Sequence, residues 1–170
     1  IEGDAGTGKS IVINKIFNEI QKLSREKTDL TPLSGTKNYL LVNHPEMMKL
    51  YRNISEKSDS VKKKDFERPT TFINTMHKTG QMADIVLVDE AHLLLTKSDK
   101  YNRFVQDNHL EEILKCARVV VLVFDDKQVL KFKSHWTKSA LASVLAQKYV
   151  QTCQLENQFR MHASAETCLW

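Results

Sequence analysis

The segment Gly3–Ser10, GDAGTGKS, carries residue types suited to holding phosphate groups. It fits the pattern G-x-x-x-x-G-K-S, in which glycines let successive backbone N–H groups turn toward phosphate oxygens. A helix that begins near Gly8 would add the positive end of its dipole. Lys9 is expected to reach the β- and γ-phosphates, and the Ser10 hydroxyl to bind Mg²⁺. The alternative is a glycine-rich turn that only starts a helix. The nucleotide site predicted here comprises Gly3, Asp4, Ala5, Gly6, Thr7, Gly8, Lys9 and Ser10.

A pair of acids follows the apolar run Ile85–Val88. At the carboxyl end of a parallel strand, Asp89 would hold Mg²⁺ through water, and Glu90 would act as general base toward the attacking water. Two consecutive acids favour hydrolysis, because a nucleotide switch can manage with one. Alternatively, the acids only begin the next helix, where they suit its dipole. His92 either couples the nucleotide state to the neighbouring motif or packs at the start of a helix.

Two further polar side chains could complete a phosphate site. Asp125 and Gln128 come just after the apolar run Val119–Phe124, and the Gln128 amide could hydrogen-bond the γ-phosphate or the attacking water. Arg160 could place its guanidinium against the transferring phosphate, where its fixed donors stabilise spreading charge. A plain polar turn at Gln128 and an ordinary surface arginine at position 160 are the alternatives.

The spacing of apolar residues indicates strands that alternate with helices. Helices are expected over Ser10–Leu23, over Leu110–Cys116, and from Pro45, which suits a first helical turn, through Tyr51. Buried parallel strands are expected at Tyr39–Val42, Ile85–Val88 and Val119–Phe124. This alternation predicts the α/β class, with a doubly wound parallel sheet and helices on both faces.

The segment Arg52–Pro69 differs in character, since it has many charges and few apolar residues. It is expected to be an exposed excursion from the fold. The run Lys62–Lys64 either contacts nucleic-acid phosphates or belongs to a solvated linker. Phe132 and Trp136, which lie near lysines, either stack on a base or cover an edge of the sheet.

Composition excludes some classes of protein. The 170 residues are 41% hydrophobic, enough for one core, yet no apolar run approaches the ~18 residues of a membrane span. An odd set of three cysteines with no C-x-x-C pair favours a reduced, cytoplasmic setting, and the net charge of +4 permits a polyanionic partner. Strands average about 5–6 residues, so with only Ile1 and Glu2 before the loop we expect a first strand cut short, as in a fragment.

Four motifs in this order, G-x-x-x-x-G-K-S, D-E-A-H, D-x-x-Q (Asp125–Gln128) and Q-F-R, resemble those of superfamily-one helicases. More narrowly, the stretches YLLVNHPEM, VDEAHLL, FDDKQVL and LENQFRMHAS are similar to an uncharacterised bacterial DNA/RNA helicase-like domain family grouped with Schlafen-type proteins. The resemblance covers most of the chain from Gly3 to Trp170 and is weakest over Arg52–Pro69.

The resemblance implies a RecA-like P-loop ATPase domain over residues 1–150, and a connection to, or start of, a second RecA-like domain over residues 151–170. It implies ATP and Mg²⁺ as cofactors and single-stranded DNA or RNA as partner, with no membrane. The implied roles are Lys9 and Ser10 on phosphate and Mg²⁺, Asp89 on Mg²⁺, Glu90 as base, Gln128 as γ-phosphate sensor and Arg160 as charge-stabilising arginine. Asn43, His44, Thr75 and His77 fall near nucleic-acid contacts of such helicases, although ordinary loop polarity explains them equally well.

The predicted function is therefore ATP hydrolysis by the first motor domain of a superfamily-one-like helicase or translocase. Such helicases clamp ATP between two domains, and the second is missing from this chain. A nucleotide-gated binding module and a small-molecule kinase remain alternatives. ATP rather than GTP rests on the resemblance, although a GTPase-type N-K-x-D reader is absent, since Ile16 and Phe17 follow Asn14-Lys15.

Overall fold

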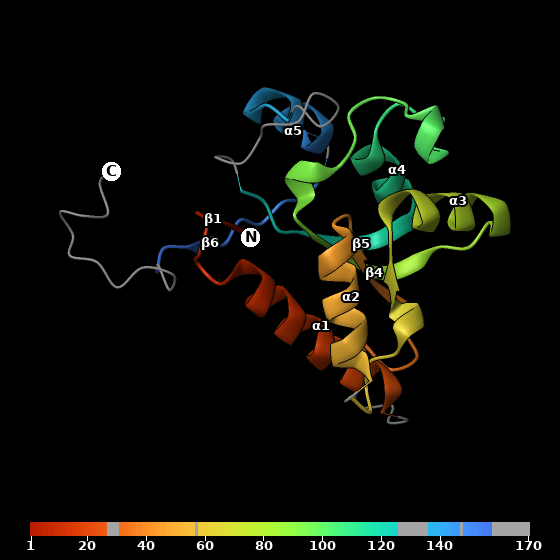
Figure 1. Cartoon of the computed structure of the whole chain (residues 1–170), viewed down its shortest axis with the longest axis vertical. Helices are drawn as coiled ribbons and strands as arrows, with labels where there is room; N and C mark the ends of the chain where they lie inside the picture. Colours follow the sequence, from red (N-terminus) through yellow and green to blue (C-terminus); the bar gives the residue numbers. More distant parts are fainter. Residues whose placement is uncertain (27–30, 57, 126–135, 147, 158–170) are drawn as a thin grey trace.

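The computed structural model describes residues 1–26, 31–56, 58–125, 136–146 and 148–157. Its helices are α1 (Lys9–Arg25), α2 (Pro45–Ser55), α3 (Pro69–Thr79), α4 (His109–Cys116) and α5 (Lys138–Leu145). Its strands are β1 (Glu2–Gly3), β2 (Asn38–Val42), β3 (Phe66–Glu67), β4 (Ala83–Asp89), β5 (Ala117–Leu122) and β6 (Gln154–Leu155). Figure 1 shows their arrangement along the chain.

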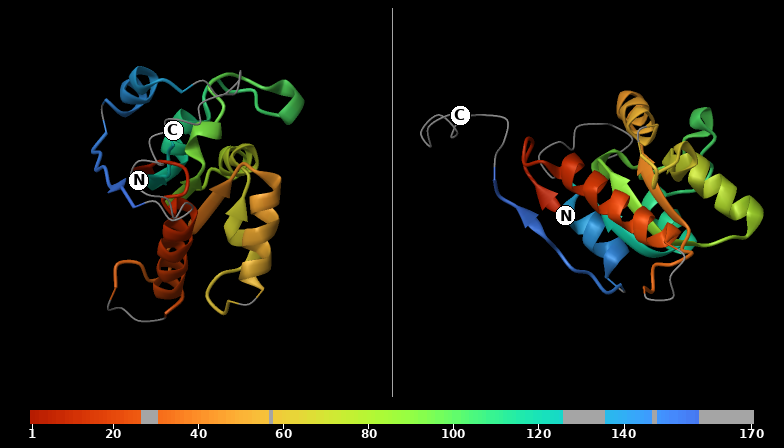
Figure 2. Two further views of the ribbon diagram at one scale, coloured as in Figure 1. Left: turned by 60° about the vertical axis from the view of Figure 1, so that its left-hand side comes forward. Right: turned by 90° about the horizontal axis from the view of Figure 1, so that it is seen from below.

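All of these strands pair in parallel. One sheet has the order β3-β2-β4-β5, and a second consists of β1 and β6. The two arrows of the small sheet lie side by side in Figure 2, red beside blue. A parallel bridge joins Glu2 to Phe124, just beyond β5, so β1 continues the larger sheet on that side. The prediction of an α/β fold with parallel strands is confirmed, and the strand before the phosphate loop lies beside the end of β5.

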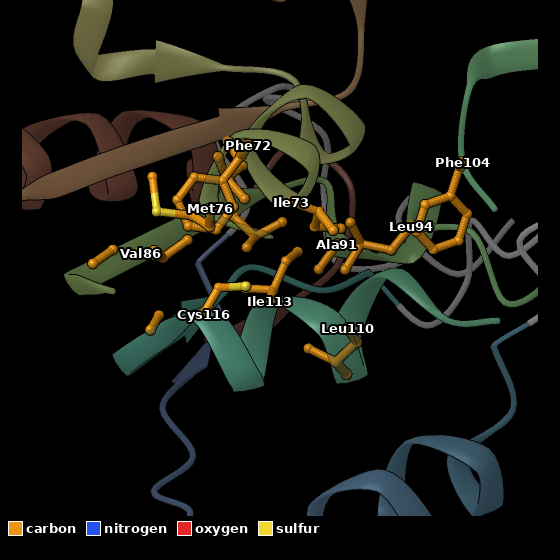
Figure 3. Packing of buried hydrophobic residues seen from close by; sticks show 14 of the residues in the cluster. Phe72, Ile73, Met76, Val86, Ala91, Leu94, Phe104, Leu110, Ile113 and Cys116 are labelled. Carbon is orange, nitrogen blue, oxygen red and sulfur yellow. The ribbon is translucent and has the colours of Figure 1, made fainter. Parts of the chain in front are cut away.

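Helices cover both faces of the sheet. On one face, α1 and α2 pack on β2 and β4 through a cluster that includes Phe17, Leu40, Tyr51 and Leu87. On the other face, α3 and α4 pack together over the sheet (Figure 3), where Ile73 and Met76 of α3 lie close to Ile113 and Cys116 of α4. Each parallel strand at the centre is therefore buried from two sides, as its continuous apolar run predicts.

Local signals account for the ends of several helices. Pro45 occupies the first turn of α2, whose first-turn Glu46 N–H donates to the side chain of His44. The side chain of Asn108 accepts hydrogen bonds from two N–H groups at the start of α4. Gly80 ends α3 in the left-handed conformation, with φ of 64°, a conformation that glycine adopts readily. The helix predicted through Tyr51 continues to Ser55.

The expectation that Arg52–Pro69 is an exposed excursion is wrong. Residues 52–55 belong to α2, β3 pairs with β2, and both Val61 and Phe66 are buried. These apolar residues are isolated in sequence, so they form no period, but both pack into the hydrophobic cluster on the α1–α2 side of the sheet. Coverage of β5 is also incomplete, because Val119 is 52% exposed.

The predicted boundary near residue 150 stays a prediction. Strand β6 lies beyond it and pairs with the phosphate-loop strand β1, with Gly3 opposite Leu155. No helix within the described ranges is both long enough and apolar enough to cross a membrane.

Candidate nucleotide-binding site

The segment Gly3–Ser10 forms a loop that leads from β1 into α1. Gly6 and Gly8 have φ of 88° and 81°, left-handed values that a side chain would disfavour. Gly8 is also the N-cap of α1, so no side chain covers the first turn of this helix. Inside the loop, the Thr7 hydroxyl donates to the Asp4 carbonyl at 2.8 Å. The loop thus presents a helix N-terminus to its interior, the arrangement that binds phosphate elsewhere.

Position 3 requires glycine for a steric reason. A Cβ atom at Gly3 would lie 2.6 Å from Thr7 Oγ1 and 3.0 Å from the carbonyl oxygen of Leu155. The loop and β6 therefore approach each other more closely than any side chain at position 3 would allow.

Lys9 lies at the centre of the loop and is nearly buried. Its Nζ donates to the carbonyls of Gly3 at 2.6 Å and Asp4 at 2.7 Å. It also forms an ion pair with Asp125 Oδ2 at 3.0 Å, and the two side chains are 9% and 0% exposed. The Lys9 ammonium group thus lies inside the loop before α1, and its predicted contact with the phosphates stays a prediction.

Asp89 is the last residue of β4 and is 1% exposed. Its Oδ1 accepts from the Ser10 hydroxyl at 3.4 Å and from the Glu90 N–H at 3.0 Å. Hydroxyl and carboxylate oxygens are ligands that Mg²⁺ prefers, and this ion commonly takes its remaining ligands from water and phosphate. Among the residues that the structure describes, no three His, Cys, Asp or Glu side chains gather as a metal site. The Ser10 hydroxyl and the Asp89 carboxylate are two oxygen groups that could serve as ligands of a magnesium ion.

Glu90 follows in an unusual backbone conformation, with φ of 53°. Burial raises the pKa of its carboxyl group, and the neighbouring Asp89 charge adds to this effect. His92 Nε2 lies 3.1 Å from Glu90 Oε2, while the His92 ring packs edge-on against Phe124. His92 therefore both contacts the acid pair and packs in a short helical turn, Ala91–Leu93. A partly buried carboxylate of raised pKa suits a general base.

The structure brings Lys9, Ser10, Asp89 and Glu90 to one edge of the sheet, as the sequence predicts for parallel strands. Gln128 and Arg160 lie outside the described residues, and their roles stay predictions. Sequence reasoning missed Tyr51, whose hydroxyl donates to Asp89 Oδ2 at 2.7 Å. No sequence signal marks it, because an apolar helix face commonly carries a tyrosine as a core residue.

Several residues considered for nucleic-acid binding have contacts within the protein. The Asn43 amide donates to the Leu93 carbonyl at 2.7 Å. This hydrogen bond connects the segment after β2 to the short helical turn that follows Glu90. His77 Nε2 lies 3.0 Å from Glu112 on the neighbouring helix. Trp136 is 4% exposed and donates to the Leu94 carbonyl, so it covers the sheet and offers no face to a base. Phe132 lies outside the described residues.

The lysines of the Lys62–Lys64 run are held in part by protein acids. Lys63 forms an ion pair with Glu56 at 2.6 Å, with both side chains more than half exposed. The Lys62 N–H donates to the carboxylate of buried Asp65. The run lies in a short helical turn that leads into β3, so it is part of the fold.

Comparisons with known proteins agree with this fold. A relative in Saccharomyces cerevisiae, uncharacterized protein YPL245W, is 44% identical over 179 residues. The match covers 100% of this chain and 39% of the yeast protein, so the chain spans about two fifths of that relative. The crystal structure of the Pyrococcus furiosus Hef helicase domain superposes with a TM-score of 0.53 at 10% identity, over 94% of this chain and 35% of that one.

At this identity the Hef structure shows a shared fold, that of a helicase RecA-like domain. The family comparison is more specific, because the model for the Schlafen group 3 DNA/RNA helicase domain matches residues 1–170. That match spans every element described above, from the phosphate loop through β6. The chain therefore belongs to the Schlafen group 3 DNA/RNA helicase domain family.

Proposed function

We propose that this chain binds Mg·ATP at the carboxyl ends of its parallel strands and hydrolyses it, as the first motor domain of a superfamily-one-like DNA or RNA helicase or translocase. One observation carries the proposal. The Ser10 hydroxyl and the Asp89 carboxylate, 79 positions apart in sequence, lie 3.4 Å from each other. Lys9, which precedes Ser10, places its ammonium group in the phosphate loop, and Glu90 follows Asp89 in sequence. These are the parts that phosphoryl transfer to water requires.

In this proposal, Glu90 accepts the proton of a water molecule that attacks the γ-phosphorus in line. The bond from that phosphorus to the β–γ bridging oxygen breaks, and ADP leaves with the electron pair. Lys9 offsets charge on the phosphate oxygens, while Ser10 and Asp89 hold the magnesium ion that neutralises the triphosphate. Gln128 and Arg160 are assigned, on the resemblance alone, to the γ-phosphate and to the spreading charge. Most of the rate enhancement then comes from positioning and charge.

Nucleotide binding would change the partners of Lys9. Its Nζ now contacts two loop carbonyls and Asp125. An entering triphosphate brings several negative charges to the same ammonium, so it competes with the Asp125 carboxylate. The ion pair therefore provides a reason for nucleotide-dependent change at Asp125, which follows β5 and precedes Gln128 in the sequence.

A nucleic-acid partner is proposed on the family description, which is that of a DNA/RNA helicase domain. The net charge of +4 is compatible with such a partner. The neighbour from Pyrococcus furiosus is named a helicase domain, and this chain covers 35% of it. We accordingly propose single-stranded DNA or RNA as the partner and a second RecA-like domain as the other half of the motor.

Phosphate release from Mg·ATP tests the proposal, with the Glu90→Gln variant as the matched control. A rate that single-stranded DNA or RNA raises several-fold supports a motor. A rate that nucleic acid leaves flat supports a nucleotide-gated binding module, and transfer to added small acceptors supports a kinase. Absence of Mg·ATP binding by the wild-type chain would overturn the proposal.

A further inference from the structure

Helix α2 contributes a buried tyrosine to the candidate site. Tyr51 is 2% exposed, and its ring stacks on Phe66 with centroids 5.6 Å apart and planes at 16°. Its hydroxyl lies 2.7 Å from Asp89 Oδ2 and 3.4 Å from the Ser10 carbonyl oxygen. A phenol has one proton to donate, and the shorter distance assigns it mainly to Asp89.

The two oxygens of Asp89 consequently have different partners. Oδ2 accepts from Tyr51, whereas Oδ1 accepts from the Glu90 N–H and the Ser10 hydroxyl. A carboxylate with both oxygens held in this way cannot rotate about its last bond without losing a hydrogen bond.

We propose that Tyr51 is a positioning residue for the metal, whose hydroxyl fixes the Asp89 carboxylate so that Oδ1 faces Ser10 and the magnesium ion. The proposal rests on the proposed Mg·ATP site. Groups that hydrogen-bond to a metal-binding side chain orient it, and removing them typically costs 10–100-fold in metal affinity or activity. Helix α2 thereby becomes part of the nucleotide site, although it carries no expected nucleotide contact.

Tyr51→Phe removes the hydroxyl and keeps the ring. We expect the dissociation constant of Mn²⁺ from the protein–ATP complex, measured by electron paramagnetic resonance, to rise by about 10-fold. ATP affinity measured in the presence of EDTA should stay within about 2-fold of wild type, because the phosphate loop is untouched. In an Asp89→Ala background the same substitution should add nothing, since the side-chain oxygens through which Tyr51 acts are gone.

Two controls separate positioning from packing. Phe66→Leu loosens the stacking partner while leaving the hydroxyl in place, and Tyr39→Phe removes a hydroxyl on the other side of the sheet, where the ring packs on Phe72. Neither should change the Mn²⁺ dissociation constant.

An unchanged Mn²⁺ dissociation constant in Tyr51→Phe would overturn the proposal. The same would follow from an equal loss in Phe66→Leu, or from a Tyr51→Phe protein that shows no cooperative unfolding transition, because either result makes the residue structural. Failure of the wild-type chain itself to bind Mn²⁺·ATP would overturn the proposed function. That result is distinguishable, because it appears before any variant is made.

Discussion

The Lys9 ammonium and the Asp125 carboxylate, 116 positions apart, form an ion pair of 3.0 Å in which Asp125 has no exposed surface. The Lys9 ammonium therefore compensates a carboxylate charge that is fully shielded from solvent. Removal of one member of a buried pair typically costs roughly 3–5 kcal/mol, because the other charge is left without compensation. Lys9 thus has a role in stability as well as in the proposed binding.

Lys9→Ala should abolish ATP binding and lower the free energy of unfolding by roughly 3–5 kcal/mol. The binding loss follows from the missing phosphate contact, and the stability loss from removal of the buried ion pair with Asp125. Nucleotide titration and urea unfolding measure the two effects. The double variant Lys9→Ala/Asp125→Asn should regain much of the stability but none of the binding. Unchanged ATP affinity in Lys9→Ala would remove the basis of the proposed function.

Glu90→Gln should retain Mg·ATP binding and lose turnover by at least about 100-fold, the usual contribution of a general base. The amide keeps the size of the side chain but cannot accept the proton of the attacking water. Phosphate release and nucleotide affinity, measured on the same preparation, separate the two effects. Glu46→Gln is the matched control, because that carboxylate is exposed and pairs only with Lys49 among the ion pairs of the described residues. A fully active Glu90→Gln protein would reassign the base.

Gly3→Ala should weaken ATP binding, because the new methyl group would clash with Thr7 Oγ1 and with the Leu155 carbonyl. One of these atoms belongs to the phosphate loop and the other to β6, so the loop or the β1–β6 pair must shift. Gly80→Ala is a useful comparison. That site is open but has φ of 64°, so the change should cost about 1 kcal/mol of stability without touching nucleotide affinity. Equal ATP affinity in Gly3→Ala and wild type would show that the loop tolerates the shift.

His109 should make stability depend on pH. The side chain is 1% exposed, its Nδ1 accepts from the Leu95 N–H at 3.1 Å, and its Nε2 lies 3.0 Å from the Thr70 hydroxyl. Burial lowers its pKa from 6.5 to about 4. The unfolded chain therefore binds the proton first as pH falls.

The contribution of His109 is complete above pH 6.5 and is lost progressively as pH falls from 6.5 toward 4. Its full size is on the order of 3 kcal/mol. Urea unfolding at several pH values measures the slope. His109→Gln should flatten the slope in this window. An unchanged slope in His109→Gln would show that other groups carry the pH dependence.

Much of the fold could be predicted because its signals are local. The runs at β2, β4 and β5 are apolar over consecutive residues, and those at β4 and β5 are rich in β-branched residues. Helix α1 shows its apolar face within two turns. Strand β3 was missed because it is two residues long and Phe66 stands alone among charges. A single apolar residue shows no periodicity in the sequence. The burial of Phe66 depends on pairing of β3 with β2 and on stacking against Tyr51, which only the structure shows.

The candidate site likewise combines features that the sequence predicts with contacts that only the structure reveals. The glycine spacing of the phosphate loop and the acids after β4 are short patterns, so the amino-acid sequence alone predicted which residues would hold phosphate and metal. It also determined that Ser10 and Asp89 would meet at one edge of a parallel sheet. Tertiary structure alone decided that Asp125 would balance Lys9 and that Tyr51 would hold Asp89. Each of these contacts joins elements far apart in the chain, and its distance depends on how helices and strands pack, which no local pattern encodes.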